Sequence, residues 1–324
     1  MSFSASTMIN RIMKQSGEKS FRKDLKKIDQ TKFDKTVCED YDISYADDNL
    51  DEHKLDVYYS ENKIKKPVLI DIHGGGFISH DKEINHLFGN YMAQKGFVVF
   101  NLNYHLAYPE YTVFDQIEDI DTAVRWILAN AEKYCGDVNA MFISGHSSAG
   151  VLALVEAMLC NNAQMLKDYN LKERNFNYKG IILDCGLMHF YKKSIAYNGM
   201  RNMIFPKNYA KTEKYKYLIF EERDEIKNLP KAVLITNKKD ELKAMTYWFK
   251  KVLEHYGVPH LLVDDGDDGH MGIIFKPYSD ANLKKLEKIS QFLYAVRGQL
   301  SGQLPAHALR SAERFTGGFN WFST

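Results

Sequence analysis

Two adjacent serines in a run of small residues are the first candidates for covalent chemistry. The run GHSSAG, residues 145–150, follows an apolar stretch typical of a strand and precedes a helical one. A nucleophile elbow forms at such a junction, where a strained turn exposes the serine hydroxyl and small neighbours let strand and helix approach closely. Ser147 fits this motif better than Ser148, because Gly145 stands two positions before Ser147. Ala149 departs from the motif, since glycine is usual two positions after the nucleophile.

Three consecutive glycines offer backbone donors for an anion. Gly74, Gly75 and Gly76 follow His73 in the segment HGGGF, directly after the apolar run PVLIDI. Acyl transfer passes through a tetrahedral intermediate whose oxyanion needs preorganised N–H donors, and glycines let backbone amides turn toward such an anion. A flexible turn is the ordinary alternative, but a purely structural turn rarely needs three glycines behind a histidine.

These motifs together carry a family resemblance. HGGGF, then NYHLAYPEY about thirty residues later, then GHSSAG resemble the hormone-sensitive-lipase-like esterases of the α/β-hydrolase superfamily. The resemblance implies an oxyanion hole made by the backbone amides of Gly75, Gly76 and Ser148, with His73 and Gly74 as supporting residues that shape the loop. It also implies a cap over the site.

In this family the chain order is serine, acid, histidine, with the last two at the ends of the last two strands. Asp240 ends the strand-like run AVLITNKKD, and His270 lies in the turn after HLLVDD. Glu241 and Asp184 are alternatives for the acid, but the strand-end position of Asp240 and the following Leu242 match the family. His270 could be an ordinary surface histidine, yet no other histidine has a strand-end position this late in the chain.

Ser147, His270 and Asp240 together predict a serine carboxylesterase. Neutral His270 would take the serine proton, the serine would form an acyl-enzyme, and water would release the acid. A cap favours small or medium-chain carboxylic esters over long-chain triglycerides. Hydrolysis of acyl amides, formamides or thioesters is an alternative, because the same triad cleaves other activated acyl groups. A non-catalytic hydrolase-like binding protein is a further one.

The sequence contains no motif that indicates a metal site or a cofactor, and none is expected. The acidic turn DDGDDGH has glycine at the third position of a calcium loop and no glutamate at the twelfth. His80, His86 and His105 lack the H-E-x-x-H spacing of zinc sites, so surface or packing roles are expected for them. None of the cysteines forms a C-x-x-C pair, so reduced thiols are expected at all four positions: Cys38, Cys135, Cys160 and Cys185.

The elements that must position these residues follow from hydrophobic periodicity. From about residue 54, strand-like runs such as KLDVYY and GFVVFNLNY alternate with amphipathic helical stretches, one of them from Ile117 to Ala131. This alternation predicts an α/β-hydrolase fold, with a mostly parallel central sheet and helices on both faces.

Three segments of the chain are expected. Residues 1–50 are an N-terminal helical segment that contributes to the cap, and residues 51–296 are the α/β-hydrolase domain. Its cap insertion is expected at about residues 187–228, where the period breaks down after Cys185. Residues 297–324 form a C-terminal tail without lysine, and this shift in composition makes a vector-derived origin a hypothesis.

The net charge does not indicate a macromolecular partner. The 43 Lys and Arg residues against 42 Asp and Glu leave a net charge of +1, which favours neither nucleic acid nor an anionic membrane. The lysine-rich N-terminus has no apolar signal segment, so a cytoplasmic location is the default expectation. The expected partner is a small-molecule ester, with a homodimer left open.

Overall fold

One mixed sheet organises the chain in the computed structural model, which describes residues 5–160, 162–190 and 194–301. Its strand order is β1-β2-β4-β3-β5-β6-β7-β8. β1 and β4 pair antiparallel with β2, and the other neighbours pair parallel. The strands are β1 (Cys38–Ser44), β2 (Lys54–Tyr59), β3 (Lys66–Ile72), β4 (Val98–Leu102), β5 (Gly136–His146), β6 (Gly180–Asp184), β7 (Lys231–Thr236) and β8 (His260–Asp264).

The parallel strands confirm the predicted fold class and bring their carboxyl ends to one edge of the sheet. In open α/β sheets, ligands bind in the crevice outside these carboxyl ends. HGGGF, GHSSAG, Asp240 and His270 lie at or just after the carboxyl ends of β3, β5, β7 and β8. The fold therefore gathers all the predicted site segments at the same edge.

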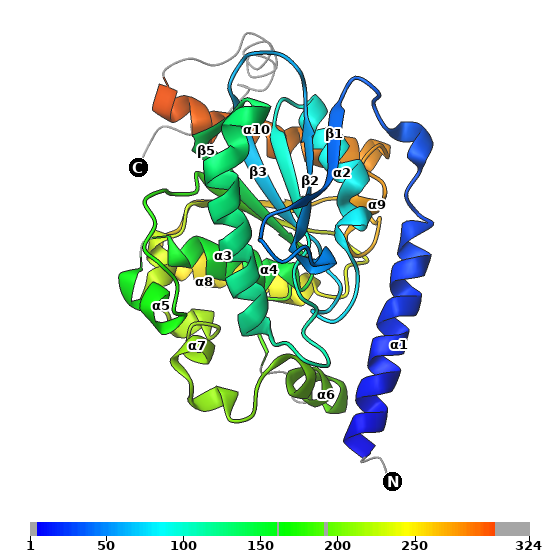
Figure 1. Cartoon of the computed structure of the whole chain (residues 1–324), viewed down its shortest axis with the longest axis vertical. Coiled ribbons are helices and arrows are strands. Elements are labelled where there is room, and N and C mark those ends of the chain that lie inside the picture. The colour runs from blue at the N-terminus through cyan, green and yellow to red at the C-terminus, as the bar shows by residue number, and fades with distance from the viewer. Residues whose placement is uncertain (1–4, 161, 191–193, 302–324) are drawn as a thin grey trace.

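Helices cover both faces of the sheet (Figure 1). One cluster of buried apolar residues joins the sheet to α3, α4 and α8, and a second joins it to α2 and α10. The α-helices are α1 (Ala5–Leu25), α2 (His86–Gln94), α3 (Val113–Asn130), α4 (Ala149–Leu159), α5 (Ala163–Asp168), α6 (Ile195–Ile204), α7 (Glu213–Lys216), α8 (Lys243–His255), α9 (Gly272–Phe275) and α10 (Asp280–Ser301).

Short 3-10 turns link these elements. They are η1 (Gln30–Lys32), η2 (Asp51–His53), η3 (Lys82–Asn85), η4 (Ala131–Tyr134), η5 (Tyr209–Lys211), η6 (Phe220–Glu222) and η7 (Asp224–Asn228). Asp29 and Asp81 accept backbone hydrogen bonds at the starts of η1 and η3, which is how such short turns satisfy their free amides.

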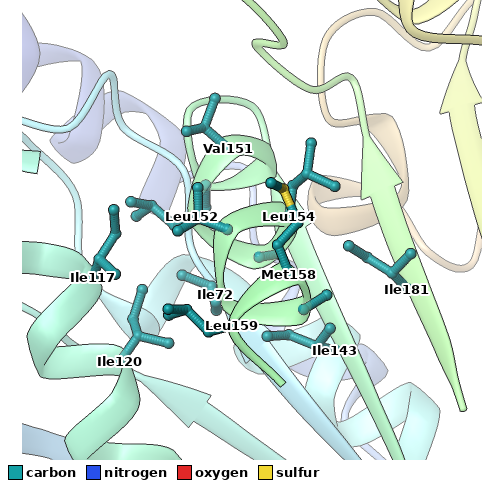
Figure 2. Packing of buried hydrophobic residues seen from close by; sticks show 14 of the residues in the cluster. Ile72, Ile117, Ile120, Ile143, Val151, Leu152, Leu154, Met158, Leu159 and Ile181 are labelled. Carbon is teal, nitrogen blue, oxygen red and sulfur yellow. The ribbon is translucent and has the colours of Figure 1, made fainter. Parts of the chain in front are cut away.

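The helix after GHSSAG is buried on all sides. Every residue of α4 is buried, because the helix lies between the sheet and α3. Apart from Glu156, which accepts hydrogen bonds from Arg174 and Tyr178, its residues are apolar, which is typical of such a position. Burying a Leu or Ile side chain contributes about 1.5–3 kcal/mol, so this packing holds the start of α4 firmly. Figure 2 shows Leu152, Leu154, Met158 and Leu159 of α4 among Ile117, Ile120, Ile72, Ile143 and Ile181.

The N-terminal segment differs in part from the expectation for residues 1–50. α1 is helical, but Cys38–Ser44 is the edge strand β1. The expected helical character of residues 38–44 is therefore wrong: β1 pairs with β2, and three of its central side chains are exposed, which leaves little apolar pattern to detect.

The segment at about residues 187–228 contains α6, α7 and three of the 3-10 turns. Phe190, Phe205, Tyr217 and Phe220 are nearly fully buried there, so these four aromatic side chains pack inward. α6 contacts α1, so these two parts of the chain lie together (Figure 1).

Most of the tail expected at residues 297–324, everything after Ser301, lies outside the described residues. Among the described helices, none is long and apolar enough to cross a membrane.

Candidate active site

Ser147 sits in a strained turn between β5 and α4. Its backbone φ is 55°, a left-handed conformation that is unfavourable for a residue with a side chain. Its amide donates to the Asp184 carbonyl at 2.9 Å, and its carbonyl accepts from Leu187 at 2.8 Å. A Cβ on Gly145 would lie 2.2 Å from the Ala149 carbonyl oxygen. The turn therefore requires glycine two positions before Ser147, as the sequence predicts.

The two residues after Ser147 point elsewhere. Ser148 is buried, and its hydroxyl accepts a hydrogen bond from the Phe77 amide at 3.3 Å, so its side chain faces the HGGGF loop. Ala149 is fully buried in the first turn of α4. A methyl group thus fits where glycine is usual.

The Ser147 hydroxyl faces an imidazole. Ser147 Oγ lies 2.7 Å from Nε2 of His270, and His270 Nδ1 lies 2.8 Å from Oδ1 of Asp240. The Asp240 side chain is fully buried, whereas the His270 side chain is 31% exposed. The three side chains form one hydrogen-bonded row although the serine and the histidine are 123 residues apart in sequence.

Asp240 is held as an ionised acceptor. Its carboxylate also accepts from the Thr236 hydroxyl at 2.6 Å and from the Leu242 amide at 2.9 Å. Burial alone would raise the pKa of Asp240, but the hydrogen bonds from His270, Thr236 and Leu242 bring it below its usual value. Thr236 is a contributor that the sequence analysis missed, and its only sequence signal is its position at the end of β7.

The alternative acids do not reach His270. Asp184 accepts instead from His146 Nδ1 at 3.0 Å, and His146 Nε2 lies 2.8 Å from Asp71. His146 is fully buried below the turn; burial would lower its pKa, but the two carboxylates raise it to about 9. Glu241 is exposed and lies at the cavity described below. This buried His146 cluster was not anticipated, because its three members come from three different strands.

The HGGGF loop is shaped by His73. Its Nδ1 donates to the Gly74 carbonyl at 2.7 Å, and its own carbonyl accepts from the Tyr104 hydroxyl at 2.6 Å. Burial lowers the pKa of His73 to about 4, so the ring is neutral. A Cβ on Gly74 would lie 2.7 Å from the His146 carbonyl, and one on Gly75, at φ 130°, would lie 1.9 Å from the Ser79 carbonyl. The loop thus needs glycine at both positions.

A cavity of about 530 Å³ opens at Ser147. The HGGGF loop, the His270 loop, α6 and α1 all contribute to its wall. α6 supplies the apolar residues Met200, Met203 and Ile204, whereas α1 supplies a largely polar surface. The lining residues are Ser16, Gly17, Ser20, Lys23, Asp24, Lys27, Gly75, Gly76, Ile78, Ser79, His80, Ser147, Met200, Met203, Ile204, Glu241, His270, Met271 and Phe275.

Two groups of potential metal ligands occur among the described residues. One joins Asp240 and His270 with Cys185, whose thiol pKa is raised by burial. The other joins His53, His105 and Asp119, which are already hydrogen-bonded: His53 Nε2 and His105 Nδ1 lie 3.0 and 2.9 Å from the Asp119 carboxylate. His86 Nε2 likewise lies 2.8 Å from the Asp56 carboxylate.

The family model named BD-FAE matches residues 55–239, more than half of the chain. The chain belongs to the BD-FAE family. The matched region contains both motif loops but ends one residue before Asp240 and well before His270. Membership in this family agrees with the predicted esterase resemblance.

Two curated proteins illustrate the relatives of this BD-FAE chain. Esterase LipC of Mycobacterium tuberculosis is 30% identical over 125 residues, which cover 38% of this chain and 30% of LipC. Arylacetamide deacetylase of Bos taurus is 34% identical over 140 residues, which cover 41% of this chain and 34% of the deacetylase. The matches therefore span about a third of the length of these relatives.

Solved structures support the fold over nearly the whole BD-FAE chain. Esterase B from Lactobacillus rhamnosis superposes with a TM-score of 0.83 at 19% identity, covering 96% of this chain and 99% of the esterase. A hyperthermophilic esterase from Pyrobaculum calidifontis gives a TM-score of 0.66 at 19% identity, covering 92% of this chain and 99% of the other. Both confirm the α/β-hydrolase fold.

Proposed function

We propose that this protein is a serine carboxylesterase that hydrolyses small or medium-chain carboxylic esters through an acyl-enzyme. The hydrogen-bonded row from Ser147 through His270 to Asp240, at 2.7 and 2.8 Å, is the observation that carries this proposal. It combines a nucleophile, a base and an orienting carboxylate within contact distance, which is the requirement for activating a serine.

In the proposed cycle, Ser147 attacks the ester carbonyl while His270 Nε2 takes its proton. His270 then gives that proton to the departing alcohol, which leaves the acyl group on Ser147. Water, activated by the same imidazole, attacks the acyl-enzyme and releases the carboxylic acid. Asp240 keeps the Nδ1 proton of His270 in place and stabilises the imidazolium, so its lowered pKa keeps the required charge at neutral pH.

The backbone amides of Gly75, Gly76 and Ser148 are proposed to bind the oxyanion. None of these three amides donates a hydrogen bond to another of the described residues, so all three are available to a ligand. His73 supports Gly75 in particular. A trans peptide is planar, with C=O and N–H on opposite sides, so holding the Gly74 carbonyl at 2.7 Å orients the Gly75 amide away from His73.

The size of the cavity supports small substrates. Pockets for drug-sized ligands have volumes of about 300–1,000 Å³, and this one measures about 530 Å³. Met200, Met203 and Ile204 offer an apolar wall for an acyl chain, whereas α1 offers polar groups. We therefore propose an ester with an acyl chain of short or medium length. α1 and the segment at residues 187–228 would together form the cap.

A fluorophosphonate probe tests the nucleophile directly. The wild-type protein should be labelled on Ser147 and should hydrolyse 4-nitrophenyl butyrate, and Ser147→Ala should lose both properties. Ser148→Ala keeps its backbone amide and should still be labelled. Removing such a nucleophile costs on the order of 10⁴- to 10⁶-fold in turnover. Labelling that persists in Ser147→Ala and disappears in Ser148→Ala would show that the assignment is wrong.

Acyl amides are the second candidate substrates. One relative, at 34% identity, is named an arylacetamide deacetylase, and the same row of side chains can cleave amides or thioesters. A substrate panel with matched acyl groups on an ester, an anilide and a thioester separates these possibilities. An ester kcat/KM well above that of the anilide is expected. The reverse order would replace esterase by amidase as the function.

A further inference from the structure

Helix α1 touches the HGGGF loop at a glycine. A Cβ on Gly17 would lie 2.8 Å from Ser79 Cβ and 2.9 Å from Ser79 Oγ, closer than real Cβ contacts. Glycine inside a helix costs about 1 kcal/mol relative to alanine. Gly17 thus weakens α1 locally but lets the helix approach Ser79. In Figure 1 the helix runs along one side of the molecule.

About two turns further along α1, Asp24 begins a chain of polar contacts that leads to Gly75. Asp24 Oδ2 lies 3.1 Å from His80 Nε2, and His80 Nδ1 lies 2.8 Å from Ser79 Oγ. The Ser79 hydroxyl then donates to the Gly75 carbonyl at 2.8 Å. Asp24 is only 9% exposed. The four residues therefore form a continuous relay from α1 to Gly75.

The groups around this relay hold it together. Phe21 of α1 packs on the His80 ring with centroids 5.4 Å apart, and Lys27 pairs with Asp24 at 2.6 Å. Burial alone would raise the pKa of Asp24, but His80 and Lys27 bring it below its usual value. His80 itself has a φ of 77°, an unfavourable conformation for a residue with a side chain. The surrounding contacts maintain this strained backbone.

The end of the relay is the carbonyl whose peptide carries the Gly76 amide. Besides the Ser79 hydroxyl, the Gly75 carbonyl accepts from the amides of Ile78 at 3.3 Å and Ser79 at 3.2 Å. Because the trans peptide is planar, fixing the Gly75 oxygen also fixes the direction of the Gly76 N–H on the opposite side. The hydrogen bond from the Ser79 hydroxyl, at the end of the relay, is thus the shortest of three hydrogen bonds that hold the peptide of one proposed oxyanion donor.

We propose that Asp24, His80 and Ser79 are positioning residues, through which α1 holds the Gly75–Gly76 peptide in the orientation that binds the oxyanion. This inference rests on the proposed esterase function. In this proposal α1 orients a group of the active site in addition to lining the cavity. None of the side chains of Asp24, His80 and Ser79 is proposed to touch the reacting atoms, so their effect should appear in the transition state and leave substrate binding nearly unchanged.

Asp24→Ala tests the relay at its far end, with Lys26→Ala as a matched control. Lys26 is an exposed neighbour directly after the end of α1 and lies outside the cavity wall. Removing a whole oxyanion donor costs about 10²- to 10³-fold in kcat. Loosening one should cost about 10-fold, with KM within about twofold. Inhibition by a trifluoromethyl ketone, which forms an oxyanion on the serine, should weaken in parallel with kcat.

Gly17→Ala supplies a variant that separates folding from positioning. Alanine should strengthen α1 by about 1 kcal/mol of helix propensity, but its methyl group would press on Ser79. We expect a lower kcat without loss of helical circular dichroism. Double variants add a further check: Asp24→Ala with Ser79→Ala should lose little more than the worse single variant, because residues of one relay are not additive.

The outcomes distinguish this proposal from the function on which it rests. If Ser147→Ala abolishes turnover while Asp24→Ala and Gly17→Ala match Lys26→Ala, the relay is overturned and the esterase assignment stands. A raised KM with unchanged kcat would also overturn it, since α1 would then only bind substrate. Full turnover in Ser147→Ala would overturn both.

Discussion

Replacing Asp240 by asparagine removes one charge from the row of side chains and little else. Oδ1 of Asp240 accepts from His270 Nδ1 and from the Leu242 amide, and Oδ2 accepts from the Thr236 hydroxyl. The Leu242 amide can only donate, whereas the Thr236 hydroxyl can also accept. Asparagine at 240 should therefore turn its oxygen toward Leu242 and His270 and its NH₂ toward Thr236. The imidazole should keep its tautomer and its place.

The expected loss then follows from the missing charge. A carboxylate and an imidazolium whose charges lie about 4 Å apart attract each other by about 4 kcal/mol at an effective dielectric constant of about 20. Since each factor of ten in rate corresponds to about 1.4 kcal/mol, kcat should fall about 10³-fold in Asp240→Asn. A flipped tautomer would cost more, about 10⁴-fold as in the serine proteases.

Stopped assays with 4-nitrophenyl butyrate can measure such a loss, with Asp265→Asn as the matched control. Asp265 is an exposed carboxylate five residues before His270, so its kcat should stay close to that of the wild type. Asp184→Asn should lower stability through His146 more than it lowers kcat. The reasoning is refuted if Asp240→Asn keeps more than a tenth of the wild-type kcat while Asp184→Asn loses about 10³-fold.

Three further predictions concern stability. Hydrogen bonds to two carboxylates outweigh burial and raise the pKa of His53 to about 9, so its contribution is complete below pH about 6.5 and is lost as pH rises through about 9. Urea unfolding of wild type and His53→Asn should therefore differ more at pH 6 than at pH 9.5; a difference independent of pH contradicts this. In Gly145→Ala the new methyl group meets the carbonyl oxygen that lies 2.2 Å away, which should cost about 1–3 kcal/mol and slow fluorophosphonate labelling. An unchanged melting temperature with full labelling would argue against that crowding. Arg174 is buried at 2.6 Å from Glu156, so Arg174→Met should lower the free energy of unfolding by about 3–5 kcal/mol, and adding Glu156→Leu should recover part of it. Equal stability of the single and double variants would contradict a buried charge pair.

Much of the site could be predicted from local sequence. Ser147 and the glycine loop could be recognised because a sharp turn after a strand permits only small residues at fixed positions, as the crowding at Gly145 shows. Asp240 and His270 could be recognised because parallel strands bring their carboxyl ends to one edge. In each case the physical requirement is contained within a few consecutive residues or within the alternation of strands and helices.

Tertiary structure decided what each polar group contacts. Asp184 and Asp240 both follow a strand, yet the first contacts the buried His146 and only the second contacts His270. A surface or packing role was expected for His80. In the structure it lies beside Asp24 of α1, although the two residues are 56 positions apart in sequence. Such pairings depend on distances between segments that chain order does not encode, so only the packed arrangement of helices and strands selects among equally plausible partners.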